Sequence, residues 1–221
     1  MASIEQWTRK YRPNTFASYV GNERTKSEIL QLLKMGKLPQ TLLFSGPQGT
    51  GKTTLARLLA KNLMCENPNG DGTACGNCYN CQQLDDDYIG GGKTTIGIPV
   101  KDVNLADVKG IDEVRDLTKD MAARSAYGSK RVYILDEIQE ASQAAQSTFL
   151  KIAEEPGEGL YIIMCTTHPD KLAKAFKSRF HQYAITKPTV TDLSNRIAFI
   201  CQNEGVNYSK EGLRLLVSKL N

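Results

Sequence analysis

The chain has 221 residues, of which 40% are hydrophobic and 24% are charged, and its formal net charge is +4. This is the composition of a soluble globular protein with room for one α/β domain and a smaller unit. No apolar run approaches the roughly 20 residues of a membrane span, and residues 1–13 lack the apolar core of a signal peptide. We therefore expect a cytoplasmic protein with no membrane partner. The charge is compatible with nucleic acid but does not argue for it.

The first predicted elements lead into a glycine-rich loop. Residues 7–20 are a basic, aromatic segment, and residues 22–35 have the pattern of a helix that Gly36 closes. Residues 41–45 (TLLFS) form a short apolar run typical of a strand. Residues 54–65 then place apolar side chains at helical spacing. The loop GPQGTGKT therefore lies between a predicted strand and a predicted helix.

This loop matches G-x-x-x-x-G-K-[ST], the phosphate-binding P-loop. Its glycines let backbone N–H groups turn toward an anion, and the helix that follows adds a favourable partial charge at its N-terminus. Lys52 would reach the β- and γ-phosphates of ATP or ADP, and the Thr53 hydroxyl would ligate Mg²⁺. The alternative, an ordinary glycine turn, is disfavoured by the strand and helix on either side. The expected nucleotide contacts are Gly46, Pro47, Gln48, Gly49, Thr50, Gly51, Lys52, Thr53 and Thr54.

Four of the six cysteines lie close together after the P-loop helix. Cys65 ends that helix, and Cys75, Cys78 and Cys81 form two overlapping C-x-x-C units. In a cytoplasmic chain such a cluster suggests a metal before it suggests disulfides. Four thiolates suit a closed, tetrahedral, structural zinc site, and they leave no ligand position for a catalytic water. The alternative is four free thiols.

The middle of the chain alternates between predicted loops, strands and helices. Residues 85–99 (DDDYIGGGKTTIGIP) have no helical period and predict an exposed loop. Residues 100–105 are a plausible strand, and residues 111–123 a helix. The apolar run 132–135 (VYIL) is typical of a buried parallel strand.

Two carboxylates, Asp136 and Glu137, follow this strand directly. Ligands in open α/β sheets bind beyond the carboxyl ends of the strands, so Asp136 should lie near the P-loop and hold Mg²⁺, directly or through water. Glu137 could polarise an attacking water, which hydrolysis requires and nucleotide binding alone does not. The alternative is a strand that ends in a solvated acidic turn.

The last third continues the alternation. Residues 142–154 predict a helix, 160–166 (LYIIMCT) a buried strand, 173–180 a short helix and 181–185 another strand. From residue 188 the pattern is helical to the end. Strands that alternate with helices predict a parallel sheet with helices on both faces.

These segments, in this order, resemble the tau/gamma subunits of bacterial DNA polymerase III clamp loaders. The resemblance covers almost the whole chain, and it is carried by RKYRPNTFASYVG, the P-loop with ARLLAKNL, the cysteine cluster, VYILDE, TFLKIAEEP, TTHPDKL and Ser178-Arg179-Phe180. It implies an AAA+ ATPase with ATP or ADP, Mg²⁺ and Zn²⁺, which opens the sliding clamp and places it on primed DNA. Replication-factor-C-type loaders resemble the rest but lack the cysteine module. A phage-encoded loader is a further alternative.

The resemblance also implies roles for residues outside the P-loop. Lys52, Asp136 and Glu137 would be catalytic, and Thr167 would match the polar sensor 1 residue that binds the γ-phosphate or the attacking water. Arg179 would act on the ATP of a neighbouring subunit, although Phe180 departs from the family's cysteine at the next position. Without the family, Arg179 would be read as a surface arginine. The segment that packs on the adenine would comprise Tyr11, Arg12, Pro13 and Val20.

The same resemblance predicts an ATPase domain over residues 1–186, with a zinc module at about 65–84, and the beginning of a helical lid over 187–221. The loop 87–99 is longer and more glycine-rich than the family leads us to expect. The family continues beyond residue 221 into a collar that holds subunits together, so we expect a mostly monomeric fragment, with a naturally short protein as the alternative.

Two other functional classes remain open. A non-hydrolysing scaffold subunit would tend to lose the P-loop lysine or the strand-end carboxylate, and Lys52 and Asp136 are both present. A P-loop kinase would carry an acceptor-site arginine set and a mobile lid. Lys109 and Arg115 could meet DNA phosphates, and a solvated helix face explains them equally well.

Overall fold

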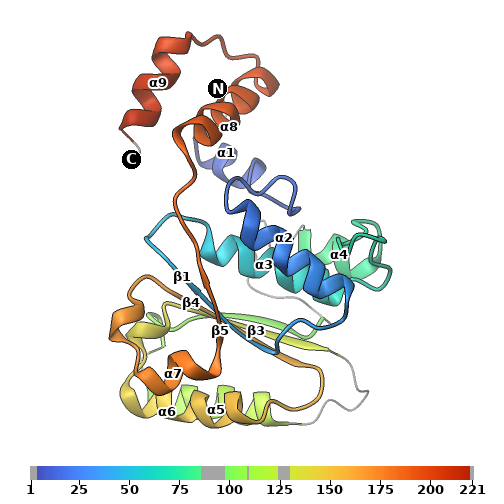
Figure 1. Ribbon diagram of the computed structural model, residues 1–221, viewed down its shortest axis with the longest axis vertical. Helices are drawn as coiled ribbons and strands as arrows, with labels where there is room; N and C mark the ends of the chain where they lie inside the picture. Colours follow the sequence, from blue (N-terminus) through green and yellow to red (C-terminus); the bar gives the residue numbers. More distant parts are fainter. Residues whose placement is uncertain (1–3, 86–97, 109, 124–129, 220–221) are drawn as a thin grey trace.

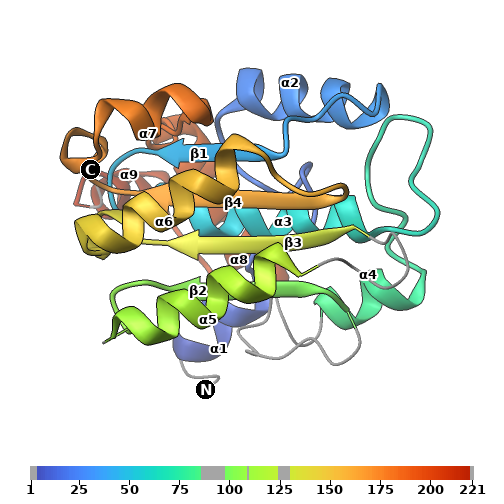
Figure 2. The same ribbon diagram turned by 90° about the horizontal axis from the view of Figure 1, so that it is seen from below.

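The computed structural model describes residues 4–85, 98–108, 110–123 and 130–219. Within them, five strands form one parallel sheet in the order β2-β3-β4-β1-β5. Figure 2 shows β2, β3, β4 and β1 side by side in this order. The parallel sheet of the sequence prediction is confirmed, and the strands have nearly the predicted bounds. They are β1 (Thr41–Ser45), β2 (Val100–Asn104), β3 (Arg131–Asp136), β4 (Leu160–Thr166) and β5 (His181–Ala184).

Helices cover both faces of the sheet, as Figure 1 shows. One face carries α2 (Glu23–Lys34), α3 (Lys52–Met64) and α4 (Tyr79–Gln83), and the other carries α5 (Ile111–Ala122), α6 (Gln143–Glu154) and α7 (Lys174–Arg179). Because side chains alternate across a strand, β1 supplies both cores. Leu42 and Phe44 pack against the side of α3, and Leu43 packs against the side of α6.

Local sequence explains where several helices begin. Ser142 caps α6 by accepting a hydrogen bond from the Ala145 amide, as short hydroxyl side chains do at helix N-termini. Thr189 and Asp192 form a reciprocal capping box at the start of α8 (Val190–Asn203). The P-loop helix begins at Lys52, before the predicted residue 54, because the loop runs directly into it.

Three local predictions differ from the structure. Asn22 does not belong to α2: its backbone is left-handed (φ 54°), and its side chain bonds the backbone of Thr186. Two short helices, α1 (Ile4–Lys10) and α4, were not predicted. They have 7 and 5 residues, too few for a 3.6-residue period to stand out.

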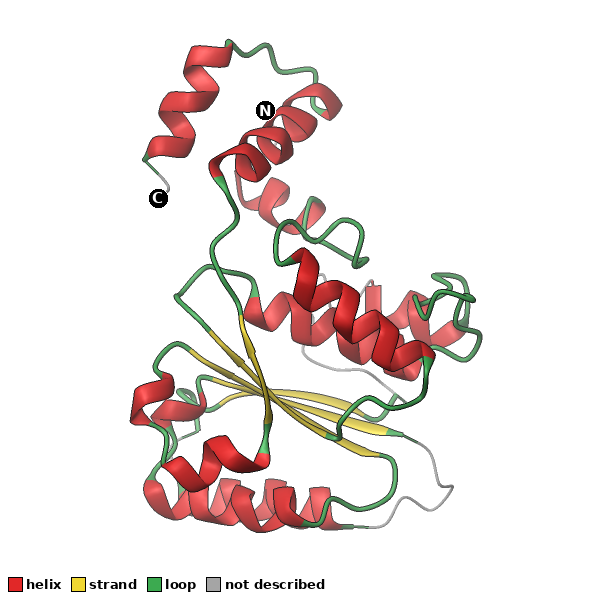
Figure 3. Cartoon of the chain, in the orientation of Figure 1, coloured by secondary structure: helices red, strands yellow, loops and turns green. Residues whose placement is uncertain are grey.

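The last two helices, α8 and α9 (Lys210–Ser218), stand apart from the sheet, and α8 lies beside α1, as Figures 1 and 3 show. Most of the predicted loop 85–99 and of the unusual segment 87–99 lies outside the described residues. Of the helices in the described ranges, none is long and apolar enough to cross a membrane.

Candidate active site and cysteine cluster

The predicted catalytic residues, apart from Arg179, meet at the carboxyl edge of the sheet. β1 runs into the P-loop, β3 ends at Asp136, and Thr167 follows the last residue of β4. Because the strands are parallel and β1 and β3 flank β4, their carboxyl ends lie side by side. This edge is where open α/β sheets bind their ligands.

At two positions of the P-loop, neighbouring atoms leave space only for glycine. A Cβ on Gly46 would lie 2.0 Å from the Ile185 carbonyl oxygen. Gly51 has a φ of 88°, and a Cβ there would lie 2.9 Å from the Tyr19 ring. L side chains rarely adopt such a φ, and neither position has space for a Cβ atom. At these two positions no side chain covers the loop backbone, which an anion would approach.

Lys52 and Thr53 make polar contacts within the P-loop and across to the end of β3. The Lys52 ammonium lies within the loop and donates to the carbonyls of Gly46 and Pro47, both at 2.9 Å. The Thr53 hydroxyl donates to an Asp136 carboxylate oxygen at 2.6 Å, although these residues are 83 positions apart. A hydroxyl and a carboxylate that converge in this way are hard oxygen ligands, which Mg²⁺ prefers.

Glu137 and Thr167 are also brought together. The Thr167 hydroxyl donates to Glu137 Oε2 at 3.0 Å. Glu137 borders two hollows, one of about 400 Å³ with Arg12, Lys52 and Thr53 on its wall and one of about 810 Å³ with Gly46 and Thr167 on its wall. The carboxylate therefore stands between the P-loop and the end of β4, where a water that attacks a phosphate would need a base.

The predicted adenine segment is spread between the P-loop and α8. Arg12 borders the 400 Å³ hollow, and burial, together with the charge of Arg57, lowers its pKa. Tyr11 instead contacts α8: its hydroxyl donates to Glu204, the residue that caps the end of this helix, at 2.6 Å, and its carbonyl accepts from Arg196 at 2.6 Å. Val20 borders a separate cavity of about 680 Å³, which Arg196 also lines. Pro13 is half-buried.

Tyr19 belongs to this segment, and no pattern in the sequence singles it out. Its hydroxyl donates to the Thr50 carbonyl in the P-loop at 3.0 Å, and burial raises its pKa to about 12. The phenol thus stays protonated and joins the segment to the loop. An aromatic residue 31 positions before its partner offers no sequence signal of this contact.

Arg179 lies at the opposite edge of the sheet. Its carbonyl accepts a hydrogen bond from the side chain of Thr41, the first residue of β1, whereas the P-loop follows the last. Its guanidinium pairs with Glu154 at 2.6 Å. Within one chain, Arg179 is therefore separated from the nucleotide loop by the length of the strand.

The four clustered cysteines meet in space. Their sulfur atoms all lie within 4.8 Å of one another, and Cys75 and Cys81 sulfurs are 4.0 Å apart. A tetrahedron with Zn–S bonds of about 2.3 Å has edges of about 3.8 Å, so the donor set fits zinc closely. Backbone amides of Asn77 and Cys78 donate to the Cys75 sulfur and lower its pKa to about 6. Burial raises the pKa of the Cys65 thiol.

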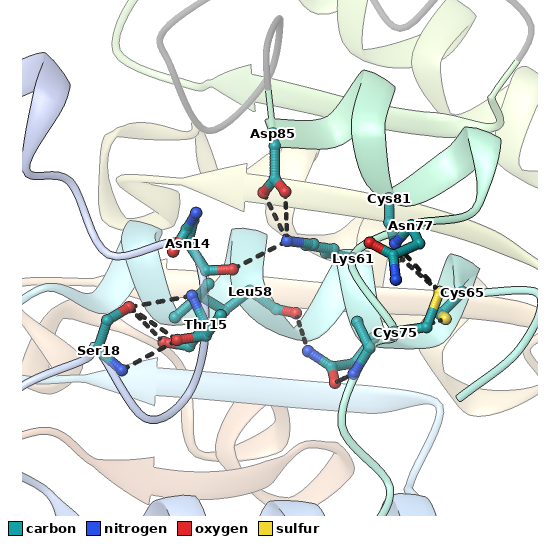
Figure 4. Close-up of polar contacts among 12 residues, drawn as sticks. Asn14, Thr15, Ser18, Leu58, Lys61, Cys65, Cys75, Asn77, Cys81 and Asp85 are labelled. Atoms are coloured by element: carbon teal, nitrogen blue, oxygen red, sulfur yellow. Dashed lines mark hydrogen bonds and ion pairs between the residues drawn. The ribbon is translucent and has the colours of Figure 1, made fainter. Parts of the chain in front are cut away.

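The last turns of α3 hold the cysteine module, as Figure 4 shows. Asn62 Oδ1 accepts from the Ala74 amide at 2.6 Å. The buried Lys61 ammonium contacts both carboxylate oxygens of Asp85, at 2.6 and 2.7 Å, and donates to the Asn14 carbonyl at 3.0 Å. One lysine therefore connects the end of the module, the P-loop helix and the N-terminal segment.

Neither candidate for DNA contact gains support from its position. Lys109 lies outside the described residues. Arg115 is exposed on α5 and pairs with Asp112 at 3.0 Å.

Comparison with known proteins relates most of the chain to subunits of DNA polymerase III. A family model described as "DNA polymerase III, delta subunit" matches residues 21–189. The DNA polymerase III subunit tau of Escherichia coli (strain K12) is 31% identical over 214 residues, which are 97% of this chain and 32% of that protein. The subunit gamma/tau of Mycobacterium tuberculosis (strain ATCC 25618 / H37Rv) is 36% identical over 200 residues, which are 90% of this chain and 33% of that protein. The chain spans about a third of the length of these relatives.

Solved structures share the fold of this chain. The RuvB Holliday junction branch migration motor of Thermotoga maritima matches with a TM-score of 0.63 at 18% identity, over 94% of this chain and 59% of that one. A variant of the same protein matches with a TM-score of 0.64 at 18% identity, over 94% and 60%. This likeness concerns the fold alone, a parallel sheet with helices on both faces. Since the family model covers most of the sequence, the chain belongs to the DNA polymerase III delta-subunit family, and its curated relatives over most of its length are gamma/tau subunits.

Proposed function

We propose that this chain is an ATP-binding and ATP-hydrolysing motor subunit of a DNA polymerase III clamp loader, which opens the sliding clamp and loads it on primed DNA. The observation that carries the proposal is the convergence of the P-loop with two carboxylates. Thr53 bonds Asp136, and Glu137 borders the same hollow as Lys52. Family membership supplies the replication context.

Each residue of the site would contribute one part of phosphoryl transfer to water. Lys52 would neutralise charge on the β- and γ-phosphates, while Thr53 and Asp136 would hold Mg²⁺. The bound ion would stabilise negative charge on the phosphate oxygens. Glu137 would accept the proton of the attacking water, and Thr167 would bind that water or the γ-phosphate. Positioning and charge stabilisation supply most of the catalysis in this reaction.

Hydrolysis is favoured over a non-hydrolysing scaffold role within the same complex. A scaffold needs no base beside the phosphates, yet Glu137 stands at the hollow that Lys52 lines. A replication-factor-C-like or phage-encoded loader would use the same site. The cysteine cluster favours the bacterial gamma/tau type, in which a structural zinc would tie Cys65 to the module after α3.

The arrangement of the chain supports the proposed division into domains. Residues 1–186 would form the ATPase domain and 187–221 the beginning of a lid, since α8 and α9 stand apart from the sheet. Tyr11 and Arg12 extend from the lid to the P-loop and would lie beside the adenine with Pro13 and Val20. A nucleotide bound there would touch both parts.

Arg179 fits a role in a neighbouring active site. It lies at the opposite strand end from its own P-loop, so it would reach only the γ-phosphate of another subunit. Other clamp-loader subunits, the sliding clamp and primed DNA are accordingly the proposed partners.

Two substitutions test the proposed hydrolysis. Lys52→Ala should abolish most nucleotide binding or turnover, because it removes the positive charge that faces the phosphates. Glu137→Gln should keep nucleotide affinity and stop turnover, because it retains the shape but not the basic carboxylate. Binding is measured with a fluorescent nucleotide, and turnover by phosphate release from the assembled complex. A Glu137→Gln complex that hydrolyses ATP at the wild-type rate would remove Glu137 from this role.

A further inference from the structure

Gln139 lies two residues beyond Glu137, in the short 3₁₀ helix Ile138–Glu140, and no motif in the sequence assigns it a role. Its amide nitrogen donates to the Thr167 hydroxyl at 3.0 Å and also to Glu137 Oε2. Its amide oxygen accepts from the Thr166 hydroxyl at 2.7 Å. One side chain therefore connects the ends of the neighbouring strands β3 and β4.

Thr166 determines which way this amide faces. The Thr166 side chain is fully buried, and its hydroxyl accepts a hydrogen bond from the His168 amide at 3.1 Å. A hydroxyl has a single hydrogen to donate, and here it goes to Gln139 Oε1. Because the amide oxygen is held at Thr166, the amide nitrogen must face Thr167 and Glu137.

Two donors then converge on one oxygen of the candidate base. Glu137 Oε2 accepts from both Gln139 and Thr167. The Glu137 backbone is left-handed, with a φ of 53°, a conformation that is unfavourable for non-glycine residues. Such a backbone persists only when its surroundings hold it, so the network helps to decide where the carboxylate stands.

We propose that Gln139 is a positioning residue for ATP hydrolysis. It holds the Glu137 carboxylate against the Thr167 hydroxyl, so that one carboxylate oxygen is anchored while the carboxylate faces the hollow that the P-loop borders. Gln139 lines that 810 Å³ hollow together with Gly46 and Pro47. The inference rests on the proposed ATPase function and adds a residue to it.

The main test separates catalysis from nucleotide binding. In the complete protein with its partner subunits, Gln139→Ala should lower kcat about ten- to a hundred-fold, because a misplaced reacting group costs rates of this size. KM and nucleotide affinity should stay close to wild type, since Lys52 and Thr53 keep their contacts. Gln139→Glu preserves the shape but sets a second carboxylate against Glu137, and it should lower kcat further.

A matched pair at Thr166 tests the orientation of the amide. Thr166→Val has the same shape but lacks the hydroxyl, so Gln139 Oε1 loses the donor that holds it. The amide is then held less firmly against Glu137, and kcat should fall in the same direction as in Gln139→Ala. Thr166→Ser keeps the hydroxyl, and its kcat should fall much less than that of Thr166→Val. A merely structural role predicts instead that kcat follows the loss of thermal stability in both variants, because valine leaves Gln139 Oε1 and the His168 amide without a partner and serine leaves a small cavity.

The outcomes distinguish the inference from the function on which it rests. If the wild-type complex hydrolyses ATP and Gln139→Ala retains its kcat, the inference is overturned alone. It is also overturned if kcat falls as far in Thr166→Ser as in Thr166→Val. Thermal unfolding of each variant shows whether a loss of stability accompanies the change in kcat. A wild-type complex that binds ATP without hydrolysing it overturns both the proposed function and this inference.

Discussion

Single residues at the sheet edge differ in how strictly their surroundings constrain them. Gly46 and Gly51 have no room for a Cβ, so their identity follows from packing as well as from phosphate chemistry. Cys75 is constrained by its partners, since two backbone amides point at its sulfur. Such donors stabilise a thiolate, the form that binds metal.

The cysteine cluster gives the first residue-scale prediction. Freshly purified protein should contain about one zinc per chain, and Cys75→Ser should lose it, because three thiolates no longer close the tetrahedron. Cys201→Ser is the matched control: this buried cysteine lies in α8, outside the cluster, and its replacement should leave the metal content unchanged. Elemental analysis measures both variants.

Zinc-free wild-type protein with four freely reactive thiols would contradict this assignment. Loss of zinc in both variants would instead indicate general unfolding, which circular dichroism would detect.

At the scale of secondary structure, α3 connects more of the molecule than any pattern in its sequence indicates. Its first residue belongs to the P-loop, and its Arg57 pairs with Asp102 of β2 at 2.7 Å. Near its end, Lys61 is buried among Asp85 and the Asn14 carbonyl. The helix thus positions the cysteine module and the N-terminal segment relative to the phosphate loop.

Breaking the Lys61 contacts should destabilise the fold. Lys61→Met leaves the Asp85 carboxylate and the Asn14 carbonyl without their partner, and should cost on the order of 1–3 kcal/mol in the free energy of unfolding. Lys101→Met is the matched control, because Lys101 pairs with Asp120 while its side chain remains 56% exposed, and surface pairs contribute about 0–1 kcal/mol.

Urea unfolding of both variants measures the difference. Equal costs at the two positions would mean that Lys61 is no more than a surface ion pair, and its role in holding the module would have to be abandoned.

At the scale of the whole molecule, the sheet separates two kinds of functional residue. Lys52, Asp136, Glu137 and Thr167 lie at the carboxyl edge, and Arg179 lies at the amino edge beside Thr41. A chain built in this way presents its proposed nucleotide site on one side and an arginine on the other. Neighbours in a ring or arc could then complete each other's sites.

This geometry predicts that Arg179 acts only in trans. In the assembled complex, Arg179→Ala should lower turnover by about 10³-fold or more, because an arginine finger stabilises charge on the transferred phosphoryl group. In the isolated 221-residue chain the same substitution should change turnover little. Lys174→Ala, an exposed basic residue on the same helix, is the matched control and should have little effect in either form.

Phosphate release from the isolated chain and from the complex provides the comparison. A large loss in the isolated chain would place Arg179 in its own active site and exclude the trans arrangement.

The amino-acid sequence by itself determined those features whose residues are neighbours along the chain. The five strands, the P-loop between β1 and α3, the carboxylates after β3 and the spacing of the cysteines are all local patterns, because a strand, a phosphate loop and a C-x-x-C unit each need only neighbouring residues. The short helices α1 and α4 were not predicted, because one or two turns are too short to show a 3.6-residue hydrophobic period.

Only the tertiary structure decided which distant residues meet. Gln139 reaches Thr167 across 28 positions, Tyr19 reaches Thr50 across 31, and Lys61 joins Asn14 to Asp85. No local pattern encodes these contacts. The first depends on the order β2-β3-β4-β1-β5, which places the end of β3 beside the end of β4, and the others depend on how the N-terminal segment packs on the P-loop and α3. The parallel direction of the strands explains why Arg179 lies far from the P-loop: Arg179 comes just before a strand and the P-loop just after one, so the two lie at opposite edges of the sheet.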